Sequence, residues 1–353
     1  MRRLALPLAV VAGIVLVMTA VLYALGRAVG VGPFSPGAPT SWVFTAISRT
    51  GEEGDAREVE VIDLASGERQ LFGVDDRIFE MALSHDRRTL YVGTSNGRVF
   101  ELDALRGTYL GLIRLSAGGD VRRLVVPPNN DQLVAVTTAG SDATAALIDL
   151  GVHREKATLP LGNRLIGPSV AGRDVVLSSS DRATFEQLLT LQLDPFAVRT
   201  ETQLTTLAPT VGPRTAGPVL ALARDGAVVA LSPVGLQLRV MAPGTSGTHG
   251  VDVPLSFKPV QLVPGFDGDL VLGPTEVIHL CVGTAQRGER YVAPRETLAI
   301  QRVGAECGHF ARLGDGRIYL AIRGKPELRE LDPITGALKR TLALAGYPQR
   351  VAY

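Results

Sequence analysis

Histidine, cysteine and serine side chains supply many of the metal ligands and nucleophiles of proteins, so their spacing is the first evidence of chemistry. The 353-residue chain has five histidines: His85, His153, His249, His279 and His309. No two of them stand at the spacing of a zinc-binding pair. We interpret them as turn and surface residues and predict no metal ligand, although spacing alone leaves open a metal held by histidines from distant segments.

The sequence contains no motif of a known catalytic centre. A G-x-S-x-G elbow, a P-loop and a G-x-G-x-x-G turn after a strand are all missing. The segment "GTSGTHG", residues 244–250, brings Ser246 close to His249, but such a run between two expected strands is typical of a loop. We therefore predict no catalytic and no cofactor-binding residue, and the sequence favours a protein that is not an enzyme.

Composition indicates a globular protein rich in turns. Hydrophobic residues make up 46% of the chain, which also has 39 glycines and 22 prolines. Three of the 36 basic residues, Arg2, Arg3 and Arg27, flank an apolar N-terminal stretch, which leaves 33 basic against 35 acidic residues elsewhere. With so even a balance of charges, the sequence gives no sign of the concentrated basic surface that phosphates require. We therefore expect no nucleic-acid partner.

Residues 4–25, "LALPLAVVAGIVLVMTAVLYAL", carry no charge and are long enough to span a bilayer, which needs about 20 apolar residues. A cleaved signal peptide has a shorter core and a small-x-small site, and no convincing site follows Leu25. We expect residues 1–25 to be an uncleaved signal-anchor, a transmembrane helix, rather than a cleaved signal or a buried helix. The excess of arginine before the span places the N-terminus in the cytoplasm and the rest outside it.

Residues 26–41, "GRAVGVGPFSPGAPTS", are rich in Gly, Pro and Ser and are expected to be a spacer. The folded domain is expected over residues 42–353. The chain contains only 4 lysines among its basic residues, an arginine bias that is associated with GC-rich bacterial genomes. The expected location is therefore a bacterial cytoplasmic membrane, crossed once, with the domain on its outer side.

The residues after Trp42 show short apolar runs bounded by Asp, Asn, Gly and Pro, which is typical of strands. A turn followed by an apolar strand occurs six times, 42 to 53 residues apart. The copies are "SHDRRTLYVGT" (84–94), "PPNNDQLVAVTT" (127–138), "AGRDVVLSSS" (171–180), "ARDGAVVALS" (223–232), "GFDGDLVLG" (265–273) and "LGDGRIYLAI" (313–322). Such a period, with four short strands per unit, predicts the blades of a β-propeller.

A second repeat places an Asp at the end of a strand and a Gly four residues later. It occurs at Asp63 and Gly67, Asp103 and Gly107, and Asp332 and Gly336, and in weaker form at Asp149 and Asp194. The carboxylate can accept hydrogen bonds from the turn, and Gly adopts a positive φ at little cost, so we expect a hairpin between the third and fourth strands. In the sixth unit His279 stands where the Asp would be.

The two ends of the domain complement one another. The N-terminal end supplies three strands in "WVFTAIS" and "REVEVIDLASGERQLF", without an inner strand, and the C-terminal "YPQRVAY" supplies an inner strand alone. Joined, they make a seventh blade without exposed edges between its parts. The predicted fold class is all-β: a seven-bladed β-propeller of four-stranded blades, closed by N- and C-terminal strands and preceded by one transmembrane helix.

The segments "VIDLASGER" and "SHDRRTLYVGT" resemble the YVTN-type seven-bladed propeller repeat, in which a V-x-D-x-x-x-G hairpin accompanies a D-G-x-x-x-Y-V strand. The resemblance is strong over residues 57–115 and 308–353 and weak between about 165 and 300. It implies the fold. It says little about function, because such propellers serve as surface proteins, scaffolds and redox subunits.

Cys281 and Cys307 are the only cysteines, and outside the cytoplasm an even number is compatible with a disulfide. The expected strand order opposes the bond. It places Cys281 in a hairpin between third and fourth strands and Cys307 before the first strand of the next blade, on opposite faces. A bond would require that the register here is wrong or that the insertion "GTAQRGERYVAPRE" folds back.

The spacer enters at a second strand, so its face also carries the turns between first and second and between third and fourth strands; we call this the linker-side face. The opposite, distal face carries the longer loops, and long loops on a rigid scaffold often bind partners. We hypothesise a binding surface there near five residues: Asp181, Arg182, Arg214, Glu306 and His309. The alternative is a solvated polar rim.

These observations favour a membrane-anchored, extracytoplasmic propeller that acts without catalysis or cofactor, as a protein- or ligand-binding module or an accessory subunit of a cell-envelope complex. Its expected partners are the membrane, through residues 4–25, and a protein of the envelope. One alternative is an enzyme, a metal-dependent hydrolase or lactonase or a redox subunit, that uses the axial channel. Another is a sensor or structural surface protein.

Overall fold

The computed structural model describes residues 37–51, 55–128, 131–171, 175–181, 185–206, 219–222, 228–232, 237–241, 250–254, 261–263, 269–272, 277–284, 290–294, 308–312, 318–322, 325–331 and 338–352. The side-chain contacts below come from residues 37–201, Tyr319 and 325–352. The anchor predicted over residues 1–25 lies outside the described residues. No helix among the described residues has the length and apolar character needed to cross a membrane.

The described residues form seven antiparallel, four-stranded sheets. The first three, from the inner to the outer strand, are β28 (Tyr347–Ala352), β1 (Trp42–Ser48), β2 (Glu58–Asp63) and β3 (Arg69–Gly73); β4 (Ile78–Leu83), β5 (Thr89–Thr94), β6 (Arg98–Asp103) and β7 (Tyr109–Arg114); and β8 (Asp120–Val125), β9 (Gln132–Ala139), β10 (Asp142–Asp149) and β11 (Arg154–Gly162).

The next four sheets follow in the same order. They are β12 (Arg164–Ala171), β13 (Val175–Asp181), β14 (Phe185–Leu193) and β15 (Phe196–Thr206); β16 (Val219–Leu222), β17 (Val228–Ser232), β18 (Gln237–Met241) and β19 (Gly250–Pro254); β20 (Gln261–Val263), β21 (Asp269–Leu272), β22 (Val277–Thr284) and β23 (Arg290–Pro294); and β24 (Gly308–Arg312), β25 (Ile318–Ile322), β26 (Glu327–Leu331) and β27 (Leu338–Ala343).

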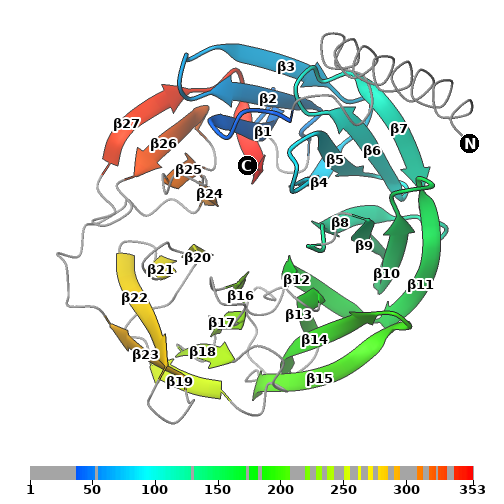
Figure 1. The fold of residues 1–353 in the computed structure, drawn as a ribbon, viewed down its shortest axis with the longest axis vertical. Coiled ribbons are helices and arrows are strands. Elements are labelled where there is room, and N and C mark those ends of the chain that lie inside the picture. The colour runs from blue at the N-terminus through cyan, green and yellow to red at the C-terminus, as the bar shows by residue number, and fades with distance from the viewer. Residues whose placement is uncertain are drawn as a thin grey trace, which may run out of the picture.

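The sheets stand around a central axis, as Figure 1 shows. Their inner strands contact one another in the order β28, β4, β8, β12, β16, β20 and β24, and β24 contacts β28 again. The ring is therefore closed. This arrangement of four-stranded antiparallel sheets is a β-propeller.

The expected closure by the two ends of the chain is confirmed. β28, the last strand, pairs with β1, the first, from Phe44 opposite Ala352 to Ser48 opposite Tyr347. The N-terminal strands β1, β2 and β3 supply the other three strands of this sheet. The six turn-plus-strand copies each contain the second strand of a sheet, β5, β9, β13, β17, β21 and β25, as the repeat predicts.

Two copies of the Asp–Gly repeat form the expected hairpins, and the third, at Asp332 and Gly336, lies outside the described residues. Asp63 ends β2, its Oδ1 accepts a hydrogen bond from the backbone N–H of Ala65 at 3.0 Å, and Gly67 has φ of 80°. Asp103 and Gly107 repeat this arrangement after β6. Hydrogen bonds from Ser41 and from the turn lower the pKa of Asp63 to about 2, which means that the folded chain favours the ionised carboxylate.

Apolar side chains between neighbouring sheets form the core. Because successive residues of a strand point to opposite faces of a sheet, each blade packs on both its neighbours. Phe44, Val61 and Leu90 are fully or almost fully buried in the cluster that joins the first two sheets. Val134, Leu177 and Leu189 lie in the cluster that joins the third and fourth.

The register predicted for the sixth sheet, β20 to β23, is wrong. His279 does not end its strand; it is the third residue of β22 and pairs with Leu270. Cys281 also lies inside β22, opposite Ala293, and not in the hairpin that follows. The apolar run "VIHLCVG" continues past His279 without an Asp to end it, so pairing with β23 extends to Thr284. Cys307 lies outside the described residues.

Candidate binding site at the axial opening

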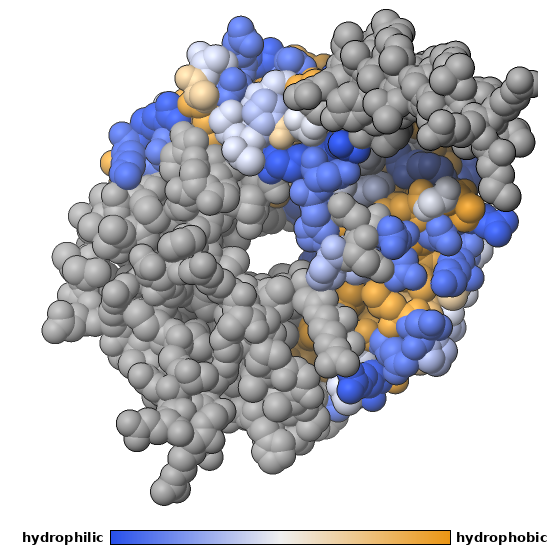
Figure 2. Space-filling model, viewed as in Figure 1, coloured by the Kyte–Doolittle hydropathy of each residue, from blue (hydrophilic) through white to orange (hydrophobic). Residues whose placement is uncertain are grey.

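The described side of the axial opening is polar. Figure 2 shows an opening on the axis of the ring, with hydrophilic residues next to it on the side that belongs to the first three sheets. The inner strands β28, β4 and β8 approach the axis there. Side chains from these strands and from the loops before them can therefore meet a ligand or partner at the opening.

A β-bulge recurs in these three inner strands. Each strand has one extra residue relative to its partner: Gln349 in β28, Phe79 in β4 and Arg122 in β8. A bulge leaves backbone groups of the extra residue outside the ladder. The next residue satisfies the freed carbonyl in two of the strands: Nη1 of Arg350 donates to Gln349 O, and Nη1 of Arg123 donates to Arg122 O, both at 2.6 Å.

Arg123 connects three consecutive sheets. Its Nη1 lies 3.2 Å from Oε2 of Glu80 on β4, and its Nη2 donates to the carbonyl of Ile166 on β12 at 3.4 Å. Less than one fifth of the surface of each of these two side chains, Arg123 and Glu80, is exposed. Burial lowers the pKa of Arg123, and the carboxylate of Glu80 opposes that shift. Removing either charge of such a buried pair would leave the other uncompensated, which is strongly destabilising.

The bulge residues of β4 and β8 contact each other. The guanidinium of Arg122 lies over the ring of Phe79, 4.3 Å from its centroid, and its Nη2 donates to Oδ2 of Asp120 at 2.7 Å. Stacking on an aromatic face restrains the arginine while its edge stays accessible.

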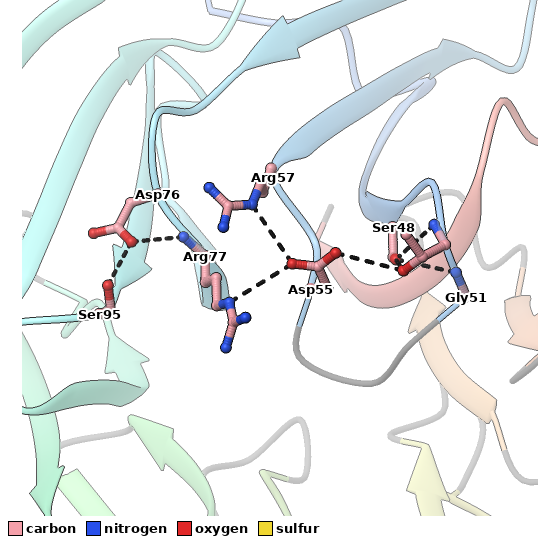
Figure 3. A network of polar contacts seen from close by, with 8 residues as sticks. Ser48, Gly51, Asp55, Arg57, Asp76, Arg77 and Ser95 are labelled. Atoms are coloured by element: carbon pink, nitrogen blue, oxygen red, sulfur yellow. Dashed lines mark hydrogen bonds and ion pairs between the residues drawn. The ribbon is translucent and has the colours of Figure 1, made fainter.

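A second group of charges lies in the distal loops (Figure 3). Asp55, in the β1–β2 loop, stands between two arginines: its Oδ1 is 3.5 Å from Nε of Arg57 and 3.6 Å from Nε of Arg77. Both arginine side chains are more than half exposed. Within the described residues their Nη atoms have no acceptor. We call Asp55, Arg57 and Arg77 the mouth cluster.

Local hydrogen bonds hold the loops that carry the mouth cluster. Ser48 Oγ accepts from the backbone N–H groups of Thr50 and Gly51, each at 3.2 Å, and Thr50 Oγ1 donates to Asp55 Oδ2 at 3.4 Å. On the other side, Asp76 accepts from the N–H of Arg77 at 2.8 Å and from the hydroxyl of Ser95. The two arginines thus stand on loops whose backbones are restrained.

The arrangement suits recognition of an anion. Within the mouth cluster, two guanidinium groups with available Nη donors and one shared carboxylate sum to a net positive charge, and the same two loops also carry Glu52, Glu53, Asp75 and Asp76. Arginine binds carboxylate or phosphate with parallel hydrogen bonds. In the part of the chain that is described, no three His, Cys, Asp or Glu side chains stand close enough together to hold a metal ion.

The structure places the backbone of two of the five predicted residues. Asp181 is the last residue of β13, opposite Arg164, and His309 is the second residue of β24, opposite Ala321. Both positions are at distal strand ends. The structure does not describe the side chains of these two residues, and it does not describe Arg182, Arg214 or Glu306 at all. The binding role hypothesised for the five residues therefore stays a prediction.

Sequence reasoning missed the arginines of the described half. The binding surface predicted on the distal face leaves out Asp55 and Arg57, which lie in the loop between β1 and β2. Arg122 and Arg123, in "DVRRLV", could have been selected from the sequence. Two adjacent arginines in an inner strand cannot both be part of an apolar core, so at least one of them is a candidate for a polar contact. Arg77 carried none, since it reads as an ordinary loop residue before β4.

No family model and no curated protein matches the sequence. The chain is similar to a protein of unknown function from Desulfotomaculum acetoxidans, with 12% identity, a TM-score of 0.64, and coverage of 88% of this chain and 98% of that one. It is also similar to the periplasmic gluconolactonase of Pseudomonas aeruginosa (15%, 0.61, 88% and 98%) and to the dihydro-heme d1 dehydrogenase NirN (13%, 0.58, 89% and 75%). At such identities the similarity shows the fold, and that fold is the β-propeller.

Proposed function

We propose that the protein is a binding module of the bacterial cell envelope. Residues 4–25 anchor it in the cytoplasmic membrane with the N-terminus inside, and a seven-bladed propeller with YVTN-type repeats lies outside. The propeller acts without catalysis, as a binding protein or an accessory subunit of a membrane complex.

The observation that carries this proposal is the separation of tether and mouth cluster onto opposite faces. On the linker-side face Arg87 donates from Nε to Ala38 O at 3.0 Å and from Nη2 to the carbonyls of Pro39 and Trp42 at 2.9 and 3.0 Å. Ala38 N–H donates back to Arg87 O at 2.7 Å. The end of the spacer is thereby held under the second sheet, while Arg57 and Arg77 stand on the distal face.

A tether that leaves from one face turns the other face away from the membrane. The mouth cluster then meets molecules of the extracytoplasmic space, and its exposed guanidinium groups bind an acidic group of the partner or ligand. Asp55 orients both arginines, and the Glu80–Arg123 pair keeps the wall of the opening rigid.

The test is a pull-down of the full-length protein in mild detergent, with copurifying proteins identified by mass spectrometry and metals quantified in the same eluate. We expect a stoichiometric membrane-associated partner that is lost when Arg57→Ala and Arg77→Ala are combined. Arg49→Ala is the matched control, because Arg49 is a similarly exposed distal arginine that pairs with Glu58 outside the cluster. Retention of every interaction in the double variant would remove the mouth cluster from the proposal.

A catalytic propeller is the second candidate, and the polar axial opening is the observation in its favour. A solitary protein that carries a stoichiometric metal would replace the binding module by a metal-dependent hydrolase or lactonase acting in the channel.

A further inference from the structure

Exposed apolar side chains gather at one edge of the propeller. Among the described residues six large apolar side chains are exposed, by 36–60%: Leu71, Tyr109, Leu110, Val152, Val198 and Leu338. Five of them lie within the first three residues of an outer strand, β3, β7, β15 or β27, and Val152 lies in the turn before β11. We call these six residues the linker-side rim.

The starts of the outer strands belong to the linker-side face. Leu64, in the turn before β3, donates its N–H to the carbonyl of Ser41 at the end of the spacer, at 3.0 Å. Arg340, two residues after Leu338 in β27, donates from Nη2 to Leu64 O at 3.4 Å. His153, next to Val152, reaches Glu101 near the end of β6 at 2.8 Å. The rim therefore lies along the face at which the spacer enters, over the five sheets whose side chains are described.

A basic residue accompanies each part of the rim. Within three residues of the apolar side chains stand six exposed basic residues, Arg69, Arg106, Arg154, Arg199, Lys339 and Arg340, against four acidic residues, Glu68, Asp149, Glu155 and Glu201. Three of the basic residues, Arg69, Arg106 and Arg340, also pair with Glu60, Asp103 and Glu330. Exposed apolar side chains next to arginine or lysine are typical of surfaces that lie on anionic membranes, where the apolar groups enter the headgroup region and the cations meet phosphates.

The distribution matches a flat partner. The rim residues come from five neighbouring sheets and lie near the starts of their outer strands, so they follow an arc around the axis instead of lining one groove. The spacer also favours a nearby membrane. Residues 26–36 can span at most about 40 Å, and Arg87 fixes the point at which the chain reaches the domain.

We propose that the linker-side rim rests on the anionic surface of the bilayer in which the protein is anchored, so that the propeller is docked on the membrane and not merely tethered to it. This inference rests on the membrane anchor of the proposed function. It adds a second, peripheral lipid contact made by the folded domain itself.

The test uses the full-length protein in vesicles of phosphatidylcholine and phosphatidylglycerol whose acyl chains are either plain or brominated near the headgroup. Tyr109→Trp reports on the rim. Arg114→Trp is the matched control, because Arg114 is exposed at the other, distal end of the same strand, about 17 Å away. The parent, with only Trp42, gives the baseline.

We expect Tyr109→Trp to lose emission in brominated vesicles relative to plain ones, beyond the parent, and Arg114→Trp to show no such loss. Equal emission in both lipids would overturn the docking. A blue-shifted but unquenched Tyr109→Trp would also overturn it, since the rim would then be covered by protein. Flotation of the same vesicles separates the two proposals. Protein that floats with the vesicles but shows no quenching would support the anchor and disprove the docking. Protein that does not float would disprove both the anchor and the docking.

Discussion

At the residue scale, the contact between Glu101 and His153 joins the second and third sheets across a buried carboxylate. His153 Nδ1 lies 2.8 Å from Oε2 of Glu101, whose side chain is almost fully buried. Tyr91 lies opposite Glu101 on β5. Burial raises the pKa of Glu101 above its ordinary value, and His153 opposes the shift. Burial first, and then the charges of Glu101 and Asp86, raise the pKa of Tyr91.

This pKa has a defined effect on stability. The folded state binds the proton of Glu101 more tightly than the unfolded state, so the free energy of unfolding should fall as pH rises from about 4.5 through the raised pKa. Glu101→Gln removes this titration. We expect the parent to lose stability relative to Glu101→Gln as pH increases, measured as urea midpoints between pH 4.5 and 8. Glu68→Gln, at an exposed turn position, should follow the parent; parallel curves for Glu101→Gln would contradict the assignment.

At the scale of elements, the two Asp–Gly hairpins of the first and second sheets differ in what surrounds the glycine. Both Gly67 and Gly107 have positive φ, 80° and 67°. A Cβ on Gly67 would meet no atom within 4 Å, whereas a Cβ on Gly107 would lie 2.1 Å from Cδ1 of Phe72 on β3. The second hairpin is therefore also an inter-blade contact.

The two glycines make a matched pair of substitutions. Gly67→Ala should cost about 1–2 kcal/mol, the strain of a left-handed backbone with a side chain. Gly107→Ala should cost about 1–3 kcal/mol more, because the methyl group overpacks against Phe72. Chemical denaturation measures both. Phe72→Leu should recover part of the loss in Gly107→Ala and none in Gly67→Ala; equal costs for the two alanine variants would disprove the contact.

At the scale of the whole molecule, the ring depends on pairing between strands from its two ends. β28 supplies the inner strand of a sheet whose other strands lie at the start of the domain, and it contacts β4 and β24 of the neighbouring sheets. Every inner strand contacts the next, so loss of β28 would interrupt the ring. Loss of β28 would also leave the edge of β1 unpaired, and an unpaired edge promotes association.

Deletion of residues 347–353 should therefore abolish the monodisperse state of the protein. Size-exclusion chromatography with light scattering should show aggregates in place of a single species. A synthetic peptide "GYPQRVAY" added during refolding should restore the monodisperse form, because the missing strand is then supplied in trans. A truncated protein that stays monodisperse and unfolds cooperatively without the peptide would show that closure by β28 is dispensable.

Much of the fold could be predicted because its signals are local. The apolar second strands, the Asp63 and Asp103 hairpins and the unmatched strands at the two ends each depend on residues only a few positions apart. The prediction failed at β22, where no Asp marks the end of the strand and the apolar run is compatible with more than one register. Sequence therefore ended the strand at His279, whereas pairing with β23 continues to Thr284.

The sequence by itself determined the strand repeat, the closure of the ring by both ends and the apolar N-terminal stretch, since these follow from alternation, turn residues and length. Only the tertiary structure brought Glu80 to Arg123, joined Arg57 and Arg77 through Asp55, and aligned the apolar starts of the outer strands along one face. These arrangements depend on how one blade is rotated and staggered against the next. Rotation and stagger arise from packing and bulges between residues about 20 to 45 positions apart, which no local pattern encodes.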